Sequence, residues 1–221
     1  DLTLIELLDY DHPLLKRAQQ ETNGTFNHSI VVGNLAEACA NSIGAHSLLC
    51  RVGAYYHDIG KMQKSEYFIE NQFGGDNKHN KITATMSARI IRAHVKEGLQ
   101  LAKEYGLPKI VSDFIPMHHG TTRVEYFYRM ALKQAEQDKT IVDESAFRYP
   151  GPKPNTKDKQ RRTKNNKLHP IETEQNPQAL FQELMNASPD GNVPSHLMAR
   201  LKETEAKQRN QNVERVESLL K

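Results

Sequence analysis

Five of the ten histidines in this 221-residue chain fall where the sequence predicts the inward faces of helices. They are His28, His57, His94, His118 and His119. One imidazole on an apolar face usually bonds to a carbonyl, but several buried together cost a few kcal/mol each if their polar atoms stay unpaired. A shared metal cluster supplies the missing partner, because imidazole binds Zn, Mn, Fe or Ni, and a carboxylate such as Asp58 bridges two ions.

Helical spacing is the observation behind this placement. The apolar residues three, four and seven positions after His28 are Val31, Val32 and Leu35. The stripe that leads to His94 consists of Met86, Ile90 and Ile91. The apolar residues four and three positions before His118 are Phe114 and Ile115. The remaining histidines lack this setting and are expected at the surface: His12, His46, His79, His169 and His196.

The elements that must position these residues are predicted to be helices. Apolar residues recur with helical period over about the first 138 residues, and no useful alternating pattern is present, so the fold class is all-α. Thr25 suits an N-cap, and Gly60 and Gly120 suit helix ends. Residues 68–81, rich in Gly, Asn and Asp, are expected to form a loop. The expected helices start at Pro13, Thr25 and Ser47 and span 82–105, 108–120 and 124–137.

The composition allows a packed core and excludes a membrane span within these residues. The chain is 37% hydrophobic and 26% charged, and no run approaches the roughly 18 apolar residues that a span needs. The 30 basic and 27 acidic residues give a net charge of +3, which is too even to indicate nucleic-acid binding. Two cysteines make no disulfide framework, so Cys39 is expected to be a reduced core thiol in a cytoplasmic setting. Asp1 at the start predicts a fragment of a longer protein.

The character of the chain changes near residue 148. Three prolines within residues 148–154 exclude a helix interior. Residues 153–167 then hold seven Lys or Arg and one acid, Asp158, which predicts an exposed linker. Binding of this stretch to anionic lipid or nucleic acid is the alternative. The expected division is therefore a domain over 1–157 and, over 158–221, a basic linker and polar helical tail that includes a long helix from Pro194.

The order of the histidine motifs, with their flanking residues, is similar to that of a known family. The motifs are His28, Tyr56-His57-Asp58-Ile59-Gly60-Lys61, His94 and His118-His119-Gly120-Thr121. They resemble the HD-domain metal-dependent phosphohydrolase superfamily. The flanks are Glu21-Thr22-Asn23-Gly24-Thr25-Phe26-Asn27-His28-Ser29, Arg51-Val52-Gly53-Ala54-Tyr55, Phe68-Ile69-Glu70-Asn71-Gln72 and Phe147-Arg148-Tyr149-Pro150-Gly151-Pro152-Lys153-Pro154. Residues 1 to about 157 resemble the cytoplasmic domain of the bacterial seven-transmembrane-receptor HD proteins, membrane phosphodiesterases that cleave cyclic di-AMP.

This resemblance implies a centre of two divalent ions, Mn or Fe. One ion would be held by His28, His57 and Asp58. Asp58 would bridge to a second ion, whose other ligands are His94, His118 and His119. Two ions close together lower the pKa of a shared water and stabilise charge on phosphoryl oxygens.

The resemblance also implies the residues that meet the substrate. Asp58 and Lys61 are the expected catalytic residues, with Lys61 near the non-bridging phosphate oxygens. A helix C-terminal cation is the alternative role for Lys61. Residues expected to contact the nucleotide are Thr121, Thr122 and Arg123, and Tyr149 or Phe147 is expected to stack on adenine, unless these aromatics only pin their loop.

One feature of the family pattern is missing. The superfamily uses a later Asp, which in this branch follows the Pro-Gly-Pro-Lys-Pro segment by a dozen or so residues, but residues 159–167 contain none. Asp158 lies in a basic context and Asp190 is far downstream. Three interpretations remain: Asp158 substitutes, the site works with fewer ligands, or the tail is foreign to this domain.

These observations predict an all-α HD hydrolase that converts cyclic di-AMP to the linear dinucleotide with a water activated by two metals. The alternatives are an HD hydrolase of another nucleotide and a sensor that binds metal and nucleotide without turnover. A cyclic di-GMP enzyme is disfavoured, because Gly120–Phe127 contains no Gly-Tyr-Pro triplet. The expected parent is a bacterial inner-membrane protein with this domain in the cytoplasm, with a homodimer as a further expectation and no nucleic-acid partner.

Overall fold

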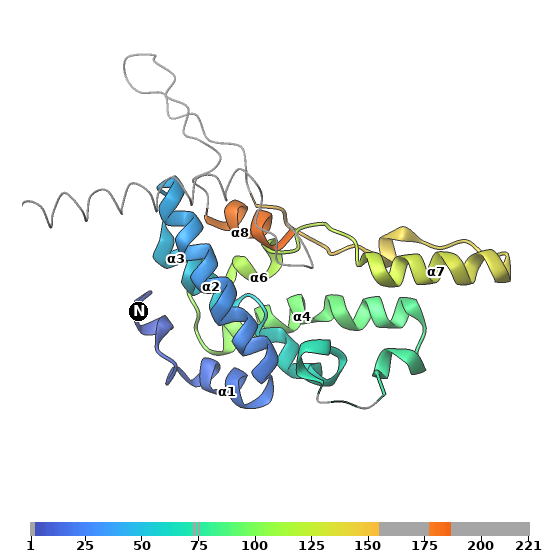
Figure 1. The fold of residues 1–221 in the computed structure, drawn as a ribbon, viewed down its shortest axis with the longest axis horizontal. Helices are drawn as coiled ribbons and strands as arrows, with labels where there is room; N and C mark the ends of the chain where they lie inside the picture. Colours follow the sequence, from blue (N-terminus) through green and yellow to red (C-terminus); the bar gives the residue numbers. More distant parts are fainter. Residues whose placement is uncertain (1–2, 73, 75, 155–176, 187–221) are drawn as a thin grey trace, which may run out of the picture.

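The fold is given by a computed structural model, which describes residues 3–72, 74, 76–154 and 177–186. Across these residues the structure is helical and forms no strand, with one isolated β-bridge between Arg123 and Arg148 (Figure 1). The all-α prediction is confirmed. None of the described helices combines the length and apolar character that a membrane crossing requires. Asp158, Asp190 and the predicted helix from Pro194 lie outside the described residues.

The first half of the chain forms a hairpin of two helices, which two shorter helical elements precede. After the 3-10 turn η1 (Glu6–Leu8) come α1 (Pro13–Glu21), α2 (Asn23–Ile43) and α3 (Ser47–Tyr56). Pro13 occupies the first turn of α1, as predicted, and the His12 side chain accepts a hydrogen bond from the Leu14 N–H. The α2 and α3 helices approach closely because Gly33 faces the Tyr55 ring, where a Cβ atom would lie 2.7 Å from a ring carbon.

The second half contributes the helices that pack against this hairpin. Short 3-10 elements η2 (Ile59–Tyr67), η3 (Ile69–Asn71) and η4 (Lys78–Lys81) lead to α4 (Ala84–Glu104). Next come α5 (Lys109–Ser112), α6 (Phe114–Met117), α7 (Glu125–Asp138), η5 (Glu144–Phe147) and α8 (Pro177–Asn186). The α5, α6 and α8 helices pack against the hairpin, while α7 packs on α4. Figure 1 shows α7 beside α4, and α8 beside α3 and α6.

Most of the apolar side chains form one core between these helices. It takes Leu14 from α1, Cys39 from α2, Tyr56 from α3, Phe114 from α6 and Phe181 from α8, all fully buried. Cys39 and Cys50 are both free thiols in this core, as expected for Cys39. A smaller cluster of Ala88, Phe127 and Phe147 lies under α7. The division of the chain at residue 157 stays a prediction, but α8 packs in the same core as the first helices.

Several local expectations were wrong. Thr25 is not an N-cap: α2 starts two residues earlier, and Thr25 is buried inside its first turn. Val31 is 67% exposed and Met86 45% exposed, because the buried faces of their helices use smaller residues such as Gly33 and Ala88. The expected helix over 108–120 is two short helices that meet at Asp113.

His79 was also misjudged, since it is buried rather than at the surface. Its Nε2 atom lies 2.9 Å from the Tyr67 carbonyl oxygen, and its ring packs 4.8 Å from that of Phe127. The sequence around it is polar, so local periodicity gave no sign of this packing against α7. His169 and His196 lie outside the described residues.

Gly60 has a different role from the predicted helix end, because α3 already ends at Tyr56. Gly60 lies where η2 crosses α4, and a Cβ atom there would come 1.8 Å from the His94 carbonyl oxygen. An added Cβ atom would therefore force the backbone of one of the two segments to move. The small side chain is therefore needed to bring Asp58 and His94, one on each of the crossing segments, close together.

We expect Gly60→Ala to lower the free energy of unfolding by about 3 kcal/mol, because the clash is with backbone rather than with a flexible side chain. Urea unfolding followed by circular dichroism measures this loss. Gly106→Ala is the matched control: Gly106 has φ of 68° and no atom within 4 Å of the added Cβ, so only about 1 kcal/mol of backbone strain is expected. Equal losses in the two variants would contradict the role given to Gly60.

Candidate metal centre

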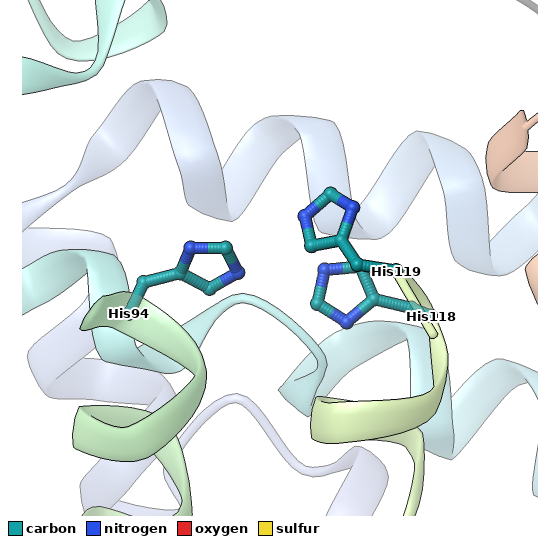
Figure 2. Close-up of side chains that lie close together, drawn as sticks. All are labelled: His94, His118 and His119. Atoms are coloured by element: carbon teal, nitrogen blue, oxygen red, sulfur yellow. The ribbon is translucent and has the colours of Figure 1, made fainter. Parts of the chain in front are cut away.

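Four helical segments bring the predicted ligands together. His28 comes from α2, His57 and Asp58 follow the last turn of α3, His94 comes from α4, and His118 with His119 follows α6. Figure 2 shows the rings of His94, His118 and His119 directed toward one another from α4 and the end of α6. Two groups have ligand atoms within 4.8 Å of one another: His94, His118 and His119, and His28, His57 and Asp58. Each group could hold a metal ion.

Backbone hydrogen bonds fix which nitrogen of each buried ring faces the centre. The Nδ1 atoms of His57, His94 and His118 lie 2.7, 2.6 and 2.7 Å from carbonyl oxygens three residues earlier. A carbonyl oxygen only accepts, so each Nδ1 must carry the proton and donate it. The Nε2 atoms are then left with lone pairs that point into the centre. Metal-binding histidines are commonly oriented by this kind of second hydrogen bond.

The buried Asp58 carboxylate lies among these lone pairs. Asp58 Oδ2 is 3.1 Å from His57 Nε2, and Oδ1 is 3.4 Å from His94 Nε2 and 3.6 Å from His118 Nε2. All three Nε2 atoms and Oδ1 are buried and have no hydrogen-bond partner among the described residues. Acceptors that face acceptors inside a protein repel one another unless a cation lies between them. The donor set therefore fits divalent transition metal ions.

Lys61 and Glu70 flank this carboxylate with a charged pair. Lys61 Nζ lies 2.8 Å from Asp58 Oδ2 and 2.7 Å from Glu70 Oε1. Glu70 also accepts a hydrogen bond from the Thr25 hydroxyl at 3.1 Å, which ties it to the first turn of the helix that carries His28. Burial favours the protonated form of Asp58, but the Lys61 ammonium beside it holds its pKa well below the ordinary value.

The imidazoles are kept neutral by burial. Desolvation lowers the pKa of His94 to about 4, and lowers the pKa of His118 and His119 well below the ordinary value. The pKa of His28, the more exposed member of its group, is also lowered by burial. Since a metal binds the deprotonated ring, these ligands are ready for metal at neutral pH without releasing protons.

The residues predicted to meet substrate occupy a turn beside His119. The Thr122 hydroxyl donates to the His119 carbonyl oxygen at 2.8 Å. The Arg123 guanidinium pairs with Glu125 and lies 4.0 Å above the Tyr128 ring, so it has partners away from the histidines. Thr121 is partly buried in the same turn. Their contact with nucleotide stays a prediction.

Tyr149 and Phe147 are both buried, and the stacking of either ring on adenine stays a prediction. The Tyr149 ring stacks on His119 with centroids 4.0 Å apart and an angle of 12°. Phe147 belongs to the small core under α7. The geometry thus gives Tyr149 a direct part in orienting His119.

Two neighbours of the centre were missed by the sequence analysis as functional residues. Glu70 was within a motif used for the family resemblance, but its pairing with Lys61 needs a contact across nine residues. Phe181 of α8 is fully buried with its ring 5.2 Å from that of His57. No pattern in the sequence connects these two positions. Thus α8, which follows the basic stretch, places an aromatic ring against His57.

Comparison with known proteins agrees with this geometry. The model of the HD domain matches residues 25–147, more than half of the chain. The chain belongs to the HD-domain family. All five histidines of the two ligand groups and Asp58 lie within the matched range.

Two curated relatives carry the name cyclic-di-AMP phosphodiesterase PgpH. The protein of Bacillus subtilis is 44% identical over 157 residues, which are 71% of this chain and 22% of the relative. The protein of Listeria monocytogenes is 48% identical over 155 residues, 70% of this chain and 21% of the relative. The chain thus spans about a fifth of the length of these relatives.

A solved structure covers nearly the whole chain. The crystal structure of the Listeria monocytogenes phosphodiesterase PgpH HD domain in complex with cyclic di-AMP has a TM-score of 0.65 and 38% sequence identity. The match covers 92% of this chain and 86% of that one. The predicted family and the all-α HD fold are therefore confirmed.

The neutral imidazoles make the metal-free protein sensitive to acid. Because the folded pKa of His94 is about 4 against an ordinary value of 6.5, the unfolded chain binds more protons between these pH values. The free energy of unfolding should therefore fall as the pH drops through this window, by about 1.4 kcal/mol per pH unit for each ring that stays neutral. Urea unfolding in the presence of a chelator, repeated across the window, measures the slope.

His94→Gln should flatten this slope, because one buried neutral ring is lost. His46→Asn is the control, since His46 is an exposed helix cap whose role Asn can take over. Identical slopes in the parent chain and His94→Gln would show that the buried ring does not set the acid response.

Proposed function

We propose that this chain is a metal-dependent phosphodiesterase that hydrolyses cyclic di-AMP to the linear dinucleotide. The observation that carries the proposal is the convergence of three buried, unpaired Nε2 atoms on the buried Asp58 carboxylate, whose Oδ1 is also unpaired among the described residues. Relatives named cyclic-di-AMP phosphodiesterase and a structural neighbour solved with cyclic di-AMP support the choice of substrate.

The ligand residues fall into two sets that share Asp58. His28, His57 and Asp58 would hold one divalent ion, and His94, His118 and His119 a second that Asp58 bridges. We favour Mn or Fe, as in the family. Bound there, such ions lower the pKa of a water and stabilise charge on the phosphoryl oxygens. In the reaction the water oxygen bonds to phosphorus, one P–O ester bond breaks, and the water's proton ends on the departing ribose oxygen.

Lys61 is proposed to be the cation that meets the non-bridging phosphate oxygens. Its ammonium is held between two carboxylates, 2.8 Å from Asp58 and 2.7 Å from Glu70. Both carboxylates raise its pKa in spite of burial, which disfavours the charged form. Glu70 therefore acts as a positioning residue that keeps Lys61 charged and directed at the centre.

A sensor that binds nucleotide without turnover is the second candidate. The observation in its favour is that Phe181, an apolar residue, packs its ring on that of His57. Among the described residues, no other carboxylate or imidazole joins the group of His28, His57 and Asp58. The same experiments test whether Asp158 supplies a further ligand to this group.

The parent protein is a separate proposal. The relatives are about five times longer than the part that this chain matches, and we propose that the parent is likewise a bacterial inner-membrane protein with this domain in the cytoplasm. A homodimer stays a prediction.

Incubation with cyclic di-AMP and Mn²⁺, followed by chromatography of the products, tests the function. We expect the linear dinucleotide from the parent chain and a loss of at least about a thousandfold in kcat for His57→Ala and Asp58→Ala, because each removes a buried ligand. Metal analysis should find two ions per chain. His46→Asn serves as the control, and circular dichroism checks that each variant is folded.

The two candidate functions give opposite results in this experiment. One weakly held ion, together with tight binding of cyclic di-AMP that is never cleaved, would establish the sensor and reject the enzyme. If the Asp158→Asn variant turns over cyclic di-AMP at the rate of the parent chain, Asp158 is excluded as a ligand.

The pair of Lys61 and Glu70 gives a further prediction. Lys61→Met should lower kcat about a hundredfold, because a cation near the developing phosphoryl charge is lost. Glu70→Gln should lower kcat about tenfold and move the upper limb of the pH–rate profile to lower pH, since Lys61 loses a stabilising carboxylate. Unchanged profiles in Glu70→Gln would assign this residue a structural role only.

A further inference from the structure

A second basic site lies beside the metal centre. A hollow of about 460 Å³ is lined by Arg89, Arg92, Ala93, Ser145, Arg148, Tyr149 and Pro150. Three of these residues are arginines and none is acidic. Two of the arginines come from α4 and the third from the segment after η5. Such a concentration of guanidinium groups is typical of phosphate recognition, because the planar fork matches phosphate oxygens.

The three arginines are not equivalent. Arg92 is structural: its Nη1 donates to the carbonyl oxygens of Ser145 at 3.0 Å and Arg148 at 2.6 Å, which pins this segment to α4. Arg148 donates to the Thr121 carbonyl oxygen and pairs with Glu144, so its charge is partly neutralised. Arg89 is exposed and makes no hydrogen bond or ion pair with another described residue. Neither Arg89 nor Arg92 is paired with a carboxylate among the described residues, but the guanidinium of Arg92 is engaged by carbonyl groups, so Arg89 is the exposed cation left for a ligand.

The hollow and the metal centre share a wall. Tyr149 lines the hollow, and its ring stacks on His119 at 4.0 Å and lies 6.0 Å from the ring of His94. The Tyr149 N–H also donates to the Thr122 carbonyl oxygen at 2.9 Å, which joins the wall to the turn after His119. Along α4, Arg89 precedes His94 by five residues, an axial rise of about 7.5 Å. Tyr149 therefore belongs to the walls of both sites.

We propose that this hollow binds the second phosphodiester of a cyclic dinucleotide, the one that is not at the metal centre, with Arg89 as its direct contact. The inference rests on the proposed function, because a substrate with two phosphodiesters has one to be cleaved and one to be held. The hollow would then select substrates with two phosphates over those with one. Arg148 adds charge at its other side, while Arg92 keeps the walls in place.

Two measurements on Arg89→Gln test the proposal. The first is the preference, in kcat/KM with Mn²⁺, for cyclic di-AMP over the dinucleoside monophosphate ApA, which has a single phosphodiester. We expect this preference to fall about tenfold, since one charge-assisted contact to the second phosphate is lost. The second is the Kd for cyclic di-AMP in the Asp58→Asn background, where turnover is suppressed, and we expect Arg89→Gln to weaken it about tenfold.

Arg89→Lys should recover part of the binding, because it restores the charge without the bidentate fork. Lys103→Gln is the matched control, an exposed cation on the same helix outside the hollow, and should leave both quantities at the parent values. An unchanged preference and an unchanged Kd in Arg89→Gln would overturn the inference. If the parent chain cleaves neither substrate, the proposed function fails, and the Kd still decides the role of Arg89.

Discussion

The structure depends on one unfavourable arrangement, a buried carboxylate surrounded by imidazole lone pairs. Asp58 Oδ1 and three Nε2 atoms lie together in the interior without hydrogen-bond partners among the described residues. Folding around such a group costs free energy unless a cation completes it. Lys61 supplies one positive charge on the Oδ2 side. The Oδ1 side retains the charge and donor set that could hold a metal ion.

The helices satisfy two demands at once around this carboxylate. They must come close enough for His57, His94 and His118 to meet, and they must fix the tautomer of each ring. Close approach comes from Gly60, which packs its backbone on α4 at the His94 carbonyl. The tautomers come from carbonyl groups three residues earlier in each segment, which accept from Nδ1. For the His119 ring, which no described backbone group holds by a hydrogen bond, stacking of Tyr149 fixes the orientation.

The surroundings of the centre differ from one side to the other. The side of Lys61 and Glu70 is charged and linked to α2 through Thr25. The side of α8 is apolar, since Phe181 covers the edge of His57. The side of Tyr149 leads to the arginine hollow. In the proposed function, a phosphodiester between these sides would have Lys61 on one side and the arginine hollow on the other.

The sequence by itself determined the chemistry of the centre. The placement of His28, His57, His94 and the pair at 118–119 predicted a metal cluster, and the order of these motifs with their flanking residues indicated the family and the ligand set that it implies. Helical period also gave the fold class and most helix ranges. These properties are local, so a single stretch of chain carries the information that predicts them.

Only the tertiary structure decided what surrounds the ligands. The contact of Phe181 with His57, the pairing of Glu70 with Thr25, and the meeting of Arg89 with Arg148 join positions that are far apart in the chain. Burial of His79 and exposure of Val31 likewise depend on which helix packs above them. Periodicity shows that a face is apolar but not which partner covers it, because packing between segments is set by shape and not by local order.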